Sequence, residues 1–600
     1  MAQDNSHRPG FDHAPVEPAH EEDEMPEVRK SVAIVIAGSG GTGAITAGSA
    51  LLASAARDGY YGLMTKLSGA QVRGGEAAAL FDIGIEPIEA QPDRFDCLIA
   101  LDWQDVHRFA PEIPLDADSI IVCDPKNGVV PDAIARSGAR IVELPIAQIA
   151  ASVEGGRLNM VGFGIAAELA GLGADAVDAA IRAMIGGKGE RAVTASLGAS
   201  AAGRAAFAAT GLSMRLPEGR RAERWMLSGN EAVGLGALRG GIEFVAAYPI
   251  TPATEITEWL AVQMQEHGGR VVLAEDEIAA INMCCGAAFG GVPTMTITAG
   301  PGLALKVETI GLAIAAEIPM VIVDVMRVGP STGIPTKSDQ GDLDIALHGT
   351  PGDAPRVVLA PISIADCAAT AERAVHVAEA LQTPVMLLSD QSIGQTQTII
   401  DIPTARPTAL KRLTVPFATG PDFRRYQLTD TGVSPMPAPG TPDCQWVADG
   451  LSHAESGHPS NSAAIHVAQL EKRLRKLEGF DFGDDWGEVF GPADAPLALL
   501  AFGSSVGPCK VAAERLTAAG TPTRVVALRL LAPVPKQRLA AALAGAKRTI
   551  VVEQNHSAQL LRHLRGERAL PHGTESFARP GPAPFRAAEI VAHILREVAA

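Results

Sequence analysis

The residues Gly241-Ile-Glu-Phe-Val-Ala-Ala247 form an apolar run that leads directly into the polar segment Tyr248-Pro-Ile-Thr-Pro-Ala-Thr-Glu255. The run is typical of a β-strand, and the segment carries two prolines, each close to a threonine hydroxyl. In α/β folds, ligands bind at the carboxyl ends of parallel strands. The pair of segments therefore predicts a ligand-binding loop at a strand end. A proline-stiffened turn between a strand and a helix is the plainer alternative.

On both sides of this loop, apolar runs alternate with helical patterns along most of the chain. Such alternation is typical of parallel sheets covered by helices. We therefore predict an α/β fold with three parallel-sheet domains, at residues 31–190, 225–400 and 495–600. Strands are predicted near 31–37, 96–101, 119–123, 140–143, 241–247, 270–274, 293–298, 319–325, 384–389, 497–502, 523–528 and 549–553.

The remaining segments differ in composition from these domains. Residues 1–30 are rich in His, Pro, Asp and Glu and predict a disordered acidic tail. Residues 191–224 are helical and then polar and Arg-rich, which predicts a linker. Residues 401–494 are Pro-, Gly- and Thr-rich up to an amphipathic charged helix near 463–478, which predicts an extended connector and a helix.

The composition excludes several classes of protein. The chain has 600 residues and a formal net charge of -18, without a strong Lys/Arg cluster, so a nucleic-acid partner is not expected. Its seven cysteines contain no CxxC motif, which argues against a zinc ribbon or iron–sulfur cluster on this chain. There is no long uncharged apolar run, and the N-terminus is too acidic for a signal peptide. We expect a cytoplasmic enzyme without a membrane partner.

A Gly-rich segment follows the first predicted strand and opens a helix. Its glycines, Gly38, Gly40, Gly41 and Gly43, match the G-x-G-x-x-G pattern in its required context. Such a turn lets a phosphate approach a helix N-terminus. An NAD site would next need an acid about 20 residues later, where this chain offers Lys66. NAD is therefore disfavoured, whereas a phosphate-bearing ligand such as coenzyme A, or a purely structural turn, stays open.

A second cationic segment, Ser68-Gly-Ala-Gln-Val-Arg73-Gly-Gly75, follows shortly afterwards. Arg73 combined with flexible glycines could bind an anion or form a subunit contact. A solvated arginine is the alternative interpretation.

Three further strand ends in the middle domain carry polar or glycine-bearing loops. Glu275-Asp-Glu277 opens an Ala/Gly-rich helix, Thr298-Ala-Gly-Pro-Gly302 follows the next strand, and Arg327-Val-Gly-Pro-Ser-Thr-Gly333 follows the one after it. Together with the loop after Ala247, these segments predict one crevice at the carboxyl edge of a sheet. Arg327 is the cation of these loops, and its planar guanidinium suits a carboxylate.

These motifs, together with Pro335-Thr-Lys-Ser-Asp-Gln-Gly-Asp342 and Val552-Glu-Gln-Asn555, resemble those of a fused gamma–alpha chain of the 2-oxoacid:ferredoxin oxidoreductases, most like the 2-oxoglutarate type. The resemblance spans residues 31–600. It implies a Rossmann-like gamma domain, a pyrimidine-binding domain of thiamine enzymes and a transketolase C-terminal-like domain, in that order.

The resemblance also implies cofactors and residue roles. The family uses thiamine diphosphate, coenzyme A and iron–sulfur clusters. Glu277 matches the carboxylate that bonds the aminopyrimidine of thiamine diphosphate, and Thr251 matches a hydroxyl that contacts the substrate. Arg327 and Thr332 match a pair that binds substrate carboxylate oxygens. The implied reaction converts 2-oxoglutarate and coenzyme A to succinyl-CoA and CO₂ and reduces ferredoxin.

The family's diphosphate-binding motif, Gly-Asp-Gly, does not occur in this chain. The resemblance therefore implies a separate beta subunit that supplies Mg²⁺, the diphosphate site and a [4Fe-4S] cluster, so that no metal site is expected on this chain. We expect a dimer of heterodimers that is inactive without the beta subunit.

Three alternative functions remain open from the sequence. The substrate could be a branched-chain or aryl 2-oxoacid such as indolepyruvate. A Rossmann-type NAD-dependent oxidoreductase belongs to a different class, and Lys66 argues against it. A noncatalytic scaffold is the third, and it would tolerate the loss of Arg327.

Overall fold

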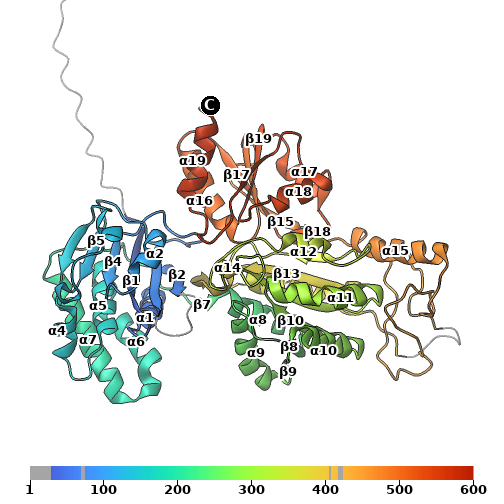
Figure 1. Ribbon diagram of the computed structural model, residues 1–600, viewed down its shortest axis with the longest axis horizontal. Coiled ribbons are helices and arrows are strands. Elements are labelled where there is room, and N and C mark those ends of the chain that lie inside the picture. The colour runs from blue at the N-terminus through green and yellow to red at the C-terminus, as the bar shows by residue number, and fades with distance from the viewer. Residues whose placement is uncertain (1–28, 69–74, 404–406, 417–422, 599–600) are drawn as a thin grey trace, which may run out of the picture.

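The computed structural model describes residues 29–68, 75–403, 407–416 and 423–598. They form three mostly parallel sheets with flanking helices (Figure 1). The predicted α/β fold class is therefore confirmed. Each predicted strand is present, with ends that shift by at most three residues. The tail predicted to be disordered lies outside the described residues, except for Arg29 and Lys30.

The first sheet has eight strands in the order β6-β5-β4-β1-β3-β2-β14-β7. β3 runs antiparallel to both of its neighbours, so this sheet is not purely parallel. Its last two strands come from the two ends of the segment predicted as the middle domain, because β14 pairs with β2 and with β7. The strands are β1 (Ser31–Ser39), β2 (Tyr61–Ser68), β3 (Glu76–Gly84), β4 (Cys97–Ala100), β5 (Ile120–Cys123), β6 (Arg140–Glu143), β7 (Arg224–Ser228) and β14 (Gln397–Asp401).

Helices cover the first sheet on a face that includes Ile34 and Ile36, which share a buried core with α1 and α5. The core also contains Val193 and Phe207 of α7, which packs along α5 although its sequence predicts a linker. The helices of this region are α1 (Ala44–Arg57), α2 (Val106–Phe109), α3 (Asp132–Ala135), α4 (Ile146–Ala151), α5 (Leu158–Ala170), α6 (Ala174–Ile185) and α7 (Glu190–Ala208).

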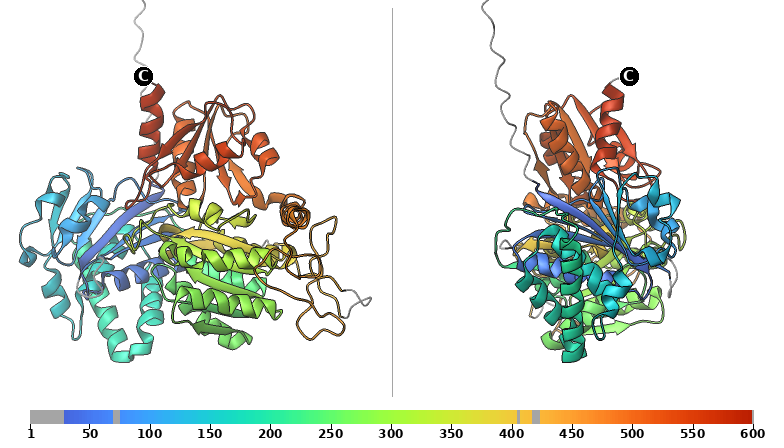
Figure 2. Two further views of the ribbon diagram at one scale, coloured as in Figure 1. Left: turned by 45° about the vertical axis from the view of Figure 1, so that its right-hand side comes forward. Right: turned by 90° about the vertical axis from the view of Figure 1, so that its left-hand side faces the viewer.

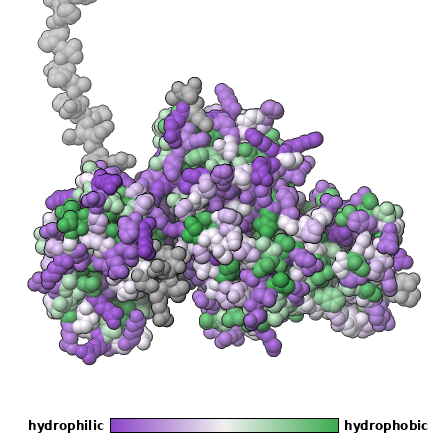
Figure 3. Space-filling model, in the orientation of Figure 1, coloured by the Kyte–Doolittle hydropathy of each residue, from purple (hydrophilic) through white to green (hydrophobic). Residues whose placement is uncertain are grey.

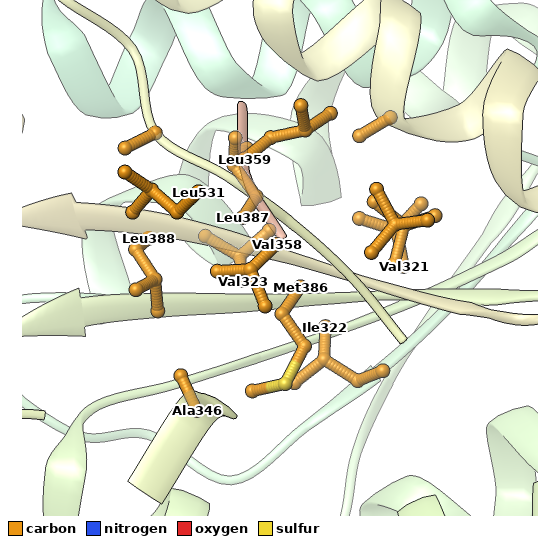
Figure 4. Close-up of a cluster of buried hydrophobic side chains, with 14 of the residues drawn as sticks. Val321, Ile322, Val323, Ala346, Val358, Leu359, Met386, Leu387, Leu388 and Leu531 are labelled. Atoms are coloured by element: carbon orange, nitrogen blue, oxygen red, sulfur yellow. The ribbon is translucent and has the colours of Figure 1, made fainter. Parts of the chain in front are cut away.

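The middle sheet has seven strands in the order β18-β12-β13-β11-β10-β8-β9, all parallel except β18. Val321 and Val323 of β11 pack with Leu387 of β13 and Val358 of β12 in its core (Figure 4). The strands are β8 (Phe244–Ala247), β9 (Arg270–Leu273), β10 (Thr294–Thr298), β11 (Met320–Met326), β12 (Val357–Leu359), β13 (Pro384–Asp390) and β18 (Leu530–Ala532).

Helices flank this sheet, and several begin at a side-chain cap. Ser228 and Glu231 form a capping box at α8, and Asp276 caps α10 by accepting a hydrogen bond from the Ala279 amide. The helices are α8 (Gly229–Gly240), α9 (Thr254–His267), α10 (Glu277–Phe289), α11 (Gly300–Ala315), α12 (Leu343–His348), α13 (Cys367–Leu381) and α14 (Gln391–Gln395).

The third sheet has five strands in the order β15-β17-β16-β19-β20, with only β15 antiparallel to its neighbour. The connector before it ends in α15 (Ala463–Glu478). The remaining elements are β15 (Gly487–Phe490), β16 (Leu497–Ala501), β17 (Thr523–Leu528), β19 (Arg548–Glu553), β20 (Glu575–Ala578), α16 (Val506–Ala518), α17 (Lys536–Leu543), α18 (Gln559–Gly566) and α19 (Ala587–Val598).

The third sheet and its helices lie above the junction of the other two sheets (Figures 1 and 2). Arg586 bonds the carbonyl oxygens of Pro92 and Glu112, and the amide of Ala588 donates to Asp93 at 2.9 Å. These contacts join the C-terminal region to the first sheet. None of the described helices is both long and apolar enough to cross a membrane.

Candidate active site

The middle sheet brings four loops to one edge. β9, β8, β10 and β11 are adjacent and parallel, so their carboxyl ends point the same way. Thr251 follows β8, Glu277 follows β9, Gly302 follows β10 and Arg327 follows β11. This is the edge at which parallel sheets bind their ligands.

Arg327 and the loop that carries Thr251 are in direct contact. The Arg327 guanidinium donates to the carbonyl oxygen of Thr251 at 2.5 Å. From the other side, the Asn230 amide donates to the carbonyl oxygen of Pro252 at 2.9 Å and to Glu255 at 3.1 Å. The loop is thus fixed by its backbone, and the Thr251 side chain stays exposed.

Glu277 is the first residue of α10 and is 8% exposed. Among the described residues, its carboxylate makes no hydrogen bond or ion pair, so its oxygens are available to a ligand. Lys306, which is fully buried, donates to the backbone oxygen of Glu277 at 2.9 Å. Burial is the main cause that lowers the pKa of Lys306 to about 8, while Cys284 and Glu277 act in the opposite direction.

The absence of a side chain at Gly302 makes room for the Glu277 carboxylate. A Cβ at this position would lie 2.2 Å from Thr298 Oγ1 and 2.9 Å from Glu277 Oε1. These distances are far below van der Waals contact. The glycine in the first turn of α11 is therefore required for the observed position of Glu277.

One buried acid and one partly buried acid lie near Arg327. Asp324 belongs to β11 and is 0% exposed, and burial raises its pKa well above the usual range. Asp342 precedes α12, and burial, followed by the charge of Asp339, raises its pKa to about 7. Arg327 favours the charged form of both acids, although it forms no ion pair with either among the described residues.

Thr332 lies in a tight loop after Arg327. Val328 and Ile334 form an isolated β-bridge that closes the loop, and Gly333 fits because a Cβ there would lie 1.6 Å from the carbonyl oxygen of Val328. The Thr332 side chain is exposed, and it makes no hydrogen bond to Arg327 within the described part of the chain. The structure therefore places the two residues in one loop without joining them.

The Gly-rich loop lies in the first sheet, apart from this crevice. Its amide and hydroxyl at Ser39 both donate to Asp102, at 3.1 and 2.8 Å, so a carboxylate already occupies part of the loop. Gly43 adopts a left-handed conformation with φ 85° and begins α1. The register places Lys66 beside Ala79, and Ala79 beside Ile36 near the end of β1, on the face that α1 covers. Arg73 lies outside the described residues.

The C-terminal motifs contact the middle sheet of the same chain. Glu553 accepts hydrogen bonds from the amides of Leu560 and Leu561 at 2.7 and 3.1 Å, and so it supports the start of α18. Gln554 bonds the carbonyl oxygen of Ser338 at 3.0 Å. The Glu-Gln-Asn motif thus lies where the third sheet meets the loop that follows β11.

A cavity of about 300 Å³ lies between the three sheets. Tyr61, Ile364, Ile393 and Phe585 are among its lining residues, and none of the predicted site residues lines it. Within the described residues, no group of three or more His, Cys, Asp or Glu side chains could hold a metal ion.

Three features of the crevice escaped sequence reasoning. Asp324 lies within an apolar strand and Lys306 within an apolar helix. Asn230 follows β7, which belongs to the first sheet rather than to the middle sheet. A charged residue inside an apolar run was the available signal for the first two, because lysine and aspartate are rarely buried without a partner. The groups that contact these two side chains could not be predicted from the apolar runs in which they lie.

Family models cover most of the chain. Residues 235–472 match the thiamine diphosphate-binding domain of pyruvate flavodoxin/ferredoxin oxidoreductases. Residues 33–206 match the pyruvate ferredoxin/flavodoxin oxidoreductase family, and residues 495–568 match core domain II of pyruvate:ferredoxin oxidoreductase. The predicted thiamine diphosphate-binding domain is thereby confirmed.

Individual relatives agree with these matches. The 2-oxoglutarate synthase subunit KorA of Methanothermobacter marburgensis is 33% identical over 56% of this chain and 88% of its own length. The 2-oxoglutarate oxidoreductase subunit KorA of Mycobacterium tuberculosis is 38% identical over 59% of this chain and 54% of its own length. The chain thus spans little more than half the length of some curated relatives.

A solved structure resembles nearly the whole chain. The 2-oxoglutarate:ferredoxin oxidoreductase of Magnetococcus marinus, with 2-oxoglutarate, coenzyme A and succinyl-CoA bound, aligns with a TM-score of 0.88 and 35% identity, over 95% of this chain and 100% of that one. The fold and the family matches thus define a protein of the class that carries the thiamine diphosphate-binding domain of the pyruvate flavodoxin/ferredoxin oxidoreductases. More narrowly, the chain belongs to the 2-oxoacid:ferredoxin oxidoreductase family, among its alpha subunits.

Proposed function

We propose that this chain is the alpha subunit of an enzyme that oxidatively decarboxylates 2-oxoglutarate. With coenzyme A and two oxidised ferredoxins, the reaction yields succinyl-CoA, CO₂, a proton and two reduced ferredoxins. The observation that carries the proposal is the crevice in which Glu277, Gly302, Thr251 and Arg327 occupy adjacent strand ends. The likeness to a structure with 2-oxoglutarate bound supports the choice of substrate.

The residues of the crevice fit thiamine diphosphate. Glu277 is nearly buried, its carboxylate has no partner within the described residues, and Gly302 keeps space beside it. Bound there, the cofactor supplies the carbanion that attacks a 2-oxo group and accepts the electrons of decarboxylation. Glu277 would hold the pyrimidine ring through a charge-assisted hydrogen bond at N1′.

Arg327 and Thr251 would position the 2-oxoacid. A guanidinium that donates to the Thr251 carbonyl oxygen keeps the remaining donors of its fork for a carboxylate. The Thr251 hydroxyl is exposed at the same strand edge and would contact the substrate, and Thr332 would close the site from the loop after Arg327. 2-Oxoglutarate has two carboxylates, so it offers Arg327 more than one group to bind, whereas a 2-oxoacid with an apolar side chain offers one.

We propose that a beta subunit completes the active site by supplying Mg²⁺, the diphosphate site and a [4Fe-4S] cluster. Exposed apolar side chains on the middle sheet and its helices would suit such a partner (Figure 3). They include Leu273 of β9, Ile278 and Met283 of α10 and Leu305 of α11. The electrons would leave to ferredoxin, and the pair would assemble as a dimer of heterodimers in the cytoplasm.

The first sheet and its helices would form the gamma-type domain and take coenzyme A. The Gly-rich loop, Gly38 to Gly43, and Lys66 lie at one end and on one face of this sheet, which supports a common role. Arg73 would contribute from the segment between β2 and β3. Asp102 already binds Ser39 in the loop, so we place the phosphates toward Lys66 rather than at Ser39.

The test is co-expression with a candidate beta subunit, followed by anaerobic, CoA-dependent viologen reduction across a panel of 2-oxoacids. We expect 2-oxoglutarate to give the highest kcat/KM and the chain alone to be inactive. The highest kcat/KM for a branched-chain or aryl 2-oxoacid would move the proposal to that substrate. Absence of activity with any 2-oxoacid would contradict it.

A variant separates this enzyme from a scaffold. Arg327→Ala should lower kcat/KM for 2-oxoglutarate by roughly thirty-fold to several thousand-fold, since loss of one partner of a buried charged contact costs about 2–5 kcal/mol. Arg562→Ala, which removes an exposed ion pair with Asp344, is the matched control and should leave activity unchanged. Equal activity of the two variants would contradict the role of Arg327.

A further inference from the structure

Asp324 is a buried acid without a hydrogen-bonding partner. It lies on β11, three residues before Arg327, and it is 0% exposed. Neither of its carboxylate oxygens accepts a hydrogen bond from any group in the described part of the protein. An ionised carboxylate in such surroundings costs several kcal/mol, so a group of this kind holds a proton unless a cation compensates it.

Asp342 is partly buried and packs against the start of α11. A Cβ on Gly300 would lie 2.6 Å from each of its two carboxylate oxygens, so this carboxyl group packs on the first residue of α11. Its Oδ2 is buried and has no partner among the described residues. Asp324 pairs in register with Thr298 of β10, two residues before Gly300, so both acids lie at the start of α11, and the charge of Asp342 raises the pKa of Asp324 further after burial.

Two other acids of the region are compensated by backbone donors. Asp390 accepts hydrogen bonds from the amides of Ile393 and Ser504, both at 3.0 Å, and Asp339 accepts one from the amide of Gln340 at 3.0 Å. Asp324 has no such donor in the described part of the chain. Its contrast with Asp390, which is equally buried, shows that burial alone does not explain the missing partners.

Arg327 is the cation that compensates these acids electrostatically, and not all of its hydrogen-bond donors have a partner within the described residues. It is 6% exposed, its guanidinium donates to Thr251, and its Nε has no partner within the described residues. The charges of Asp342 and Asp324 therefore both act on this one guanidinium before any substrate arrives. A substrate carboxylate would add a further negative charge to the same guanidinium.

We propose that Asp324 and Asp342 are positioning residues that hold a shared proton beneath Arg327, and that binding of a substrate carboxylate at Arg327 is coupled to uptake of one proton by this pair. The proton comes from the solvent, forms an O–H bond on one of the two carboxyl groups, and frees the guanidinium for the substrate. The inference rests on the proposed function, because it takes the 2-oxoacid as the ligand of Arg327.

The pair, rather than another group, is the expected site of protonation at neutral pH. Burial raises the pKa of Asp342 to about 7, and Asp339 adds to the effect while Arg327 opposes it. Burial likewise raises the pKa of Asp339 to about 6. The other ionisable groups on the elements around the pair are Asp276 before α10, Glu277, Cys284 and Cys285 of α10, Lys306 and Glu308 of α11, Lys337 and Asp339 of the loop after β11, Asp344 and His348 of α12, Asp390 of β13 and Arg579 after β20.

The test is calorimetric titration of the holoenzyme with glutarate, a dicarboxylate of the same length as the expected substrate that lacks the reactive 2-oxo group. The titration is run at pH 7.5 in phosphate and in Tris, whose ionisation enthalpies differ. We expect uptake of about 0.3 to 1 proton per glutarate. The Kd for glutarate and the KM for the 2-oxoacid should both rise from pH 7 to 9, by at most about tenfold per pH unit, because the protonated pair favours binding.

Asp342→Asn removes the titrating group but keeps the shape. It should abolish proton uptake, give a Kd that is flat with pH, and bind glutarate more tightly than the unaltered enzyme at pH 9. A merely structural role would instead weaken binding at every pH. Asp344→Asn, two residues later on an exposed ion pair, should behave as the unaltered enzyme. Asp324→Asn is the second variant should Asp342→Asn fail to fold, and it should flatten the same profile.

The outcomes separate the two proposals. A complex that oxidises 2-oxoglutarate but takes up no proton with glutarate, or binds no glutarate, overturns this inference and leaves the proposed function standing. A complex that oxidises no 2-oxoacid overturns the proposed function, and the inference with it.

Discussion

Glu317 is a buried carboxylate that joins the connector to the middle sheet. It is 0% exposed, and it accepts hydrogen bonds from Lys472 at 2.6 Å and Lys476 at 3.1 Å, both on α15. Arg425, also fully buried, donates to its backbone oxygen at 2.8 Å. Burial alone would raise the pKa of Glu317, but Lys476 and Lys472 hold it well below the usual range. The carboxylate of Glu317 thus pairs with two buried lysines, and its backbone oxygen accepts from a buried arginine.

Glu317→Gln keeps the shape of this side chain and removes its charge. Breaking a buried ion pair by removing one partner costs about 3–5 kcal/mol, because a charge is left buried without compensation. We therefore expect α15 to dock on the middle sheet about a hundred-fold to several thousand-fold less favourably. Limited proteolysis of the segment 407–416 and the urea midpoint of unfolding measure this change. Glu567→Gln is the control, since its ion pair with Lys536 is exposed and worth about 0–1 kcal/mol.

The pH dependence gives a second check of the same reasoning. Burial is the main cause that lowers the pKa of Lys476 from 10.5 to about 8. Between these two values the unfolded chain binds more protons than the folded one, so the stability contributed by this group rises with pH. The penalty of Glu317→Gln should therefore be smaller at pH 9 than at pH 7. Equal midpoints for Glu317→Gln and Glu567→Gln, or a penalty that grows with pH, would refute the argument.

Two further predictions concern the support of Glu277. Gly302→Ala should lower kcat by about a hundred-fold or more, because its methyl group would displace the Glu277 carboxylate, whereas Gly566→Ala, with open space around it, should leave kcat unchanged. Equal kcat values for the two would contradict the need for a glycine. Lys306→Met removes the charged donor to the Glu277 backbone, a bond worth about 1.5–3 kcal/mol, and should lower kcat. The unaltered enzyme should lose activity above pH 8 as Lys306 loses its proton, and the variant should not show this loss.

The sheets could be predicted from the sequence because their central strands are continuous apolar runs. The pairing of β14 with β2 could not, because Thr398 and Leu63 are far apart in the chain and neither run indicates its neighbour. β3 was not predicted either. It follows β2 without an intervening helix and pairs antiparallel, so it does not fit the alternation of helices and strands on which the prediction was based. β12 and β18 have three residues each, too few to show a period.

The part of the crevice that could be predicted consists of residues that directly follow a strand in the sequence. Thr251, Glu277 and Arg327 follow strands, and the rule that parallel strands bind ligands at their carboxyl ends brings them to one edge. Asp324 and Lys306 face the same region from within secondary structure. The residues that they contact are set by how the elements pack against each other. The spacing of residues along a single strand or helix carries no information about that packing.

The third sheet contributes none of the predicted substrate contacts, yet it holds the segment that ends in Asp342. The Gln340 side chain donates to the carbonyl oxygen of Phe502 at 2.8 Å and accepts from Ser505 at 3.0 Å and from the amide of Gln554 at 2.8 Å. Its own amide donates to the carbonyl oxygen of Gln554 at 2.7 Å. These buried bonds involve two loops of the third sheet and fix Gln340, which lies two residues before Asp342. The C-terminal region thus supports the loop that leads to Asp342, and its Glu-Gln-Asn motif does so through hydrogen bonds to Gln340 and Ser338 rather than through any of the predicted substrate-binding residues.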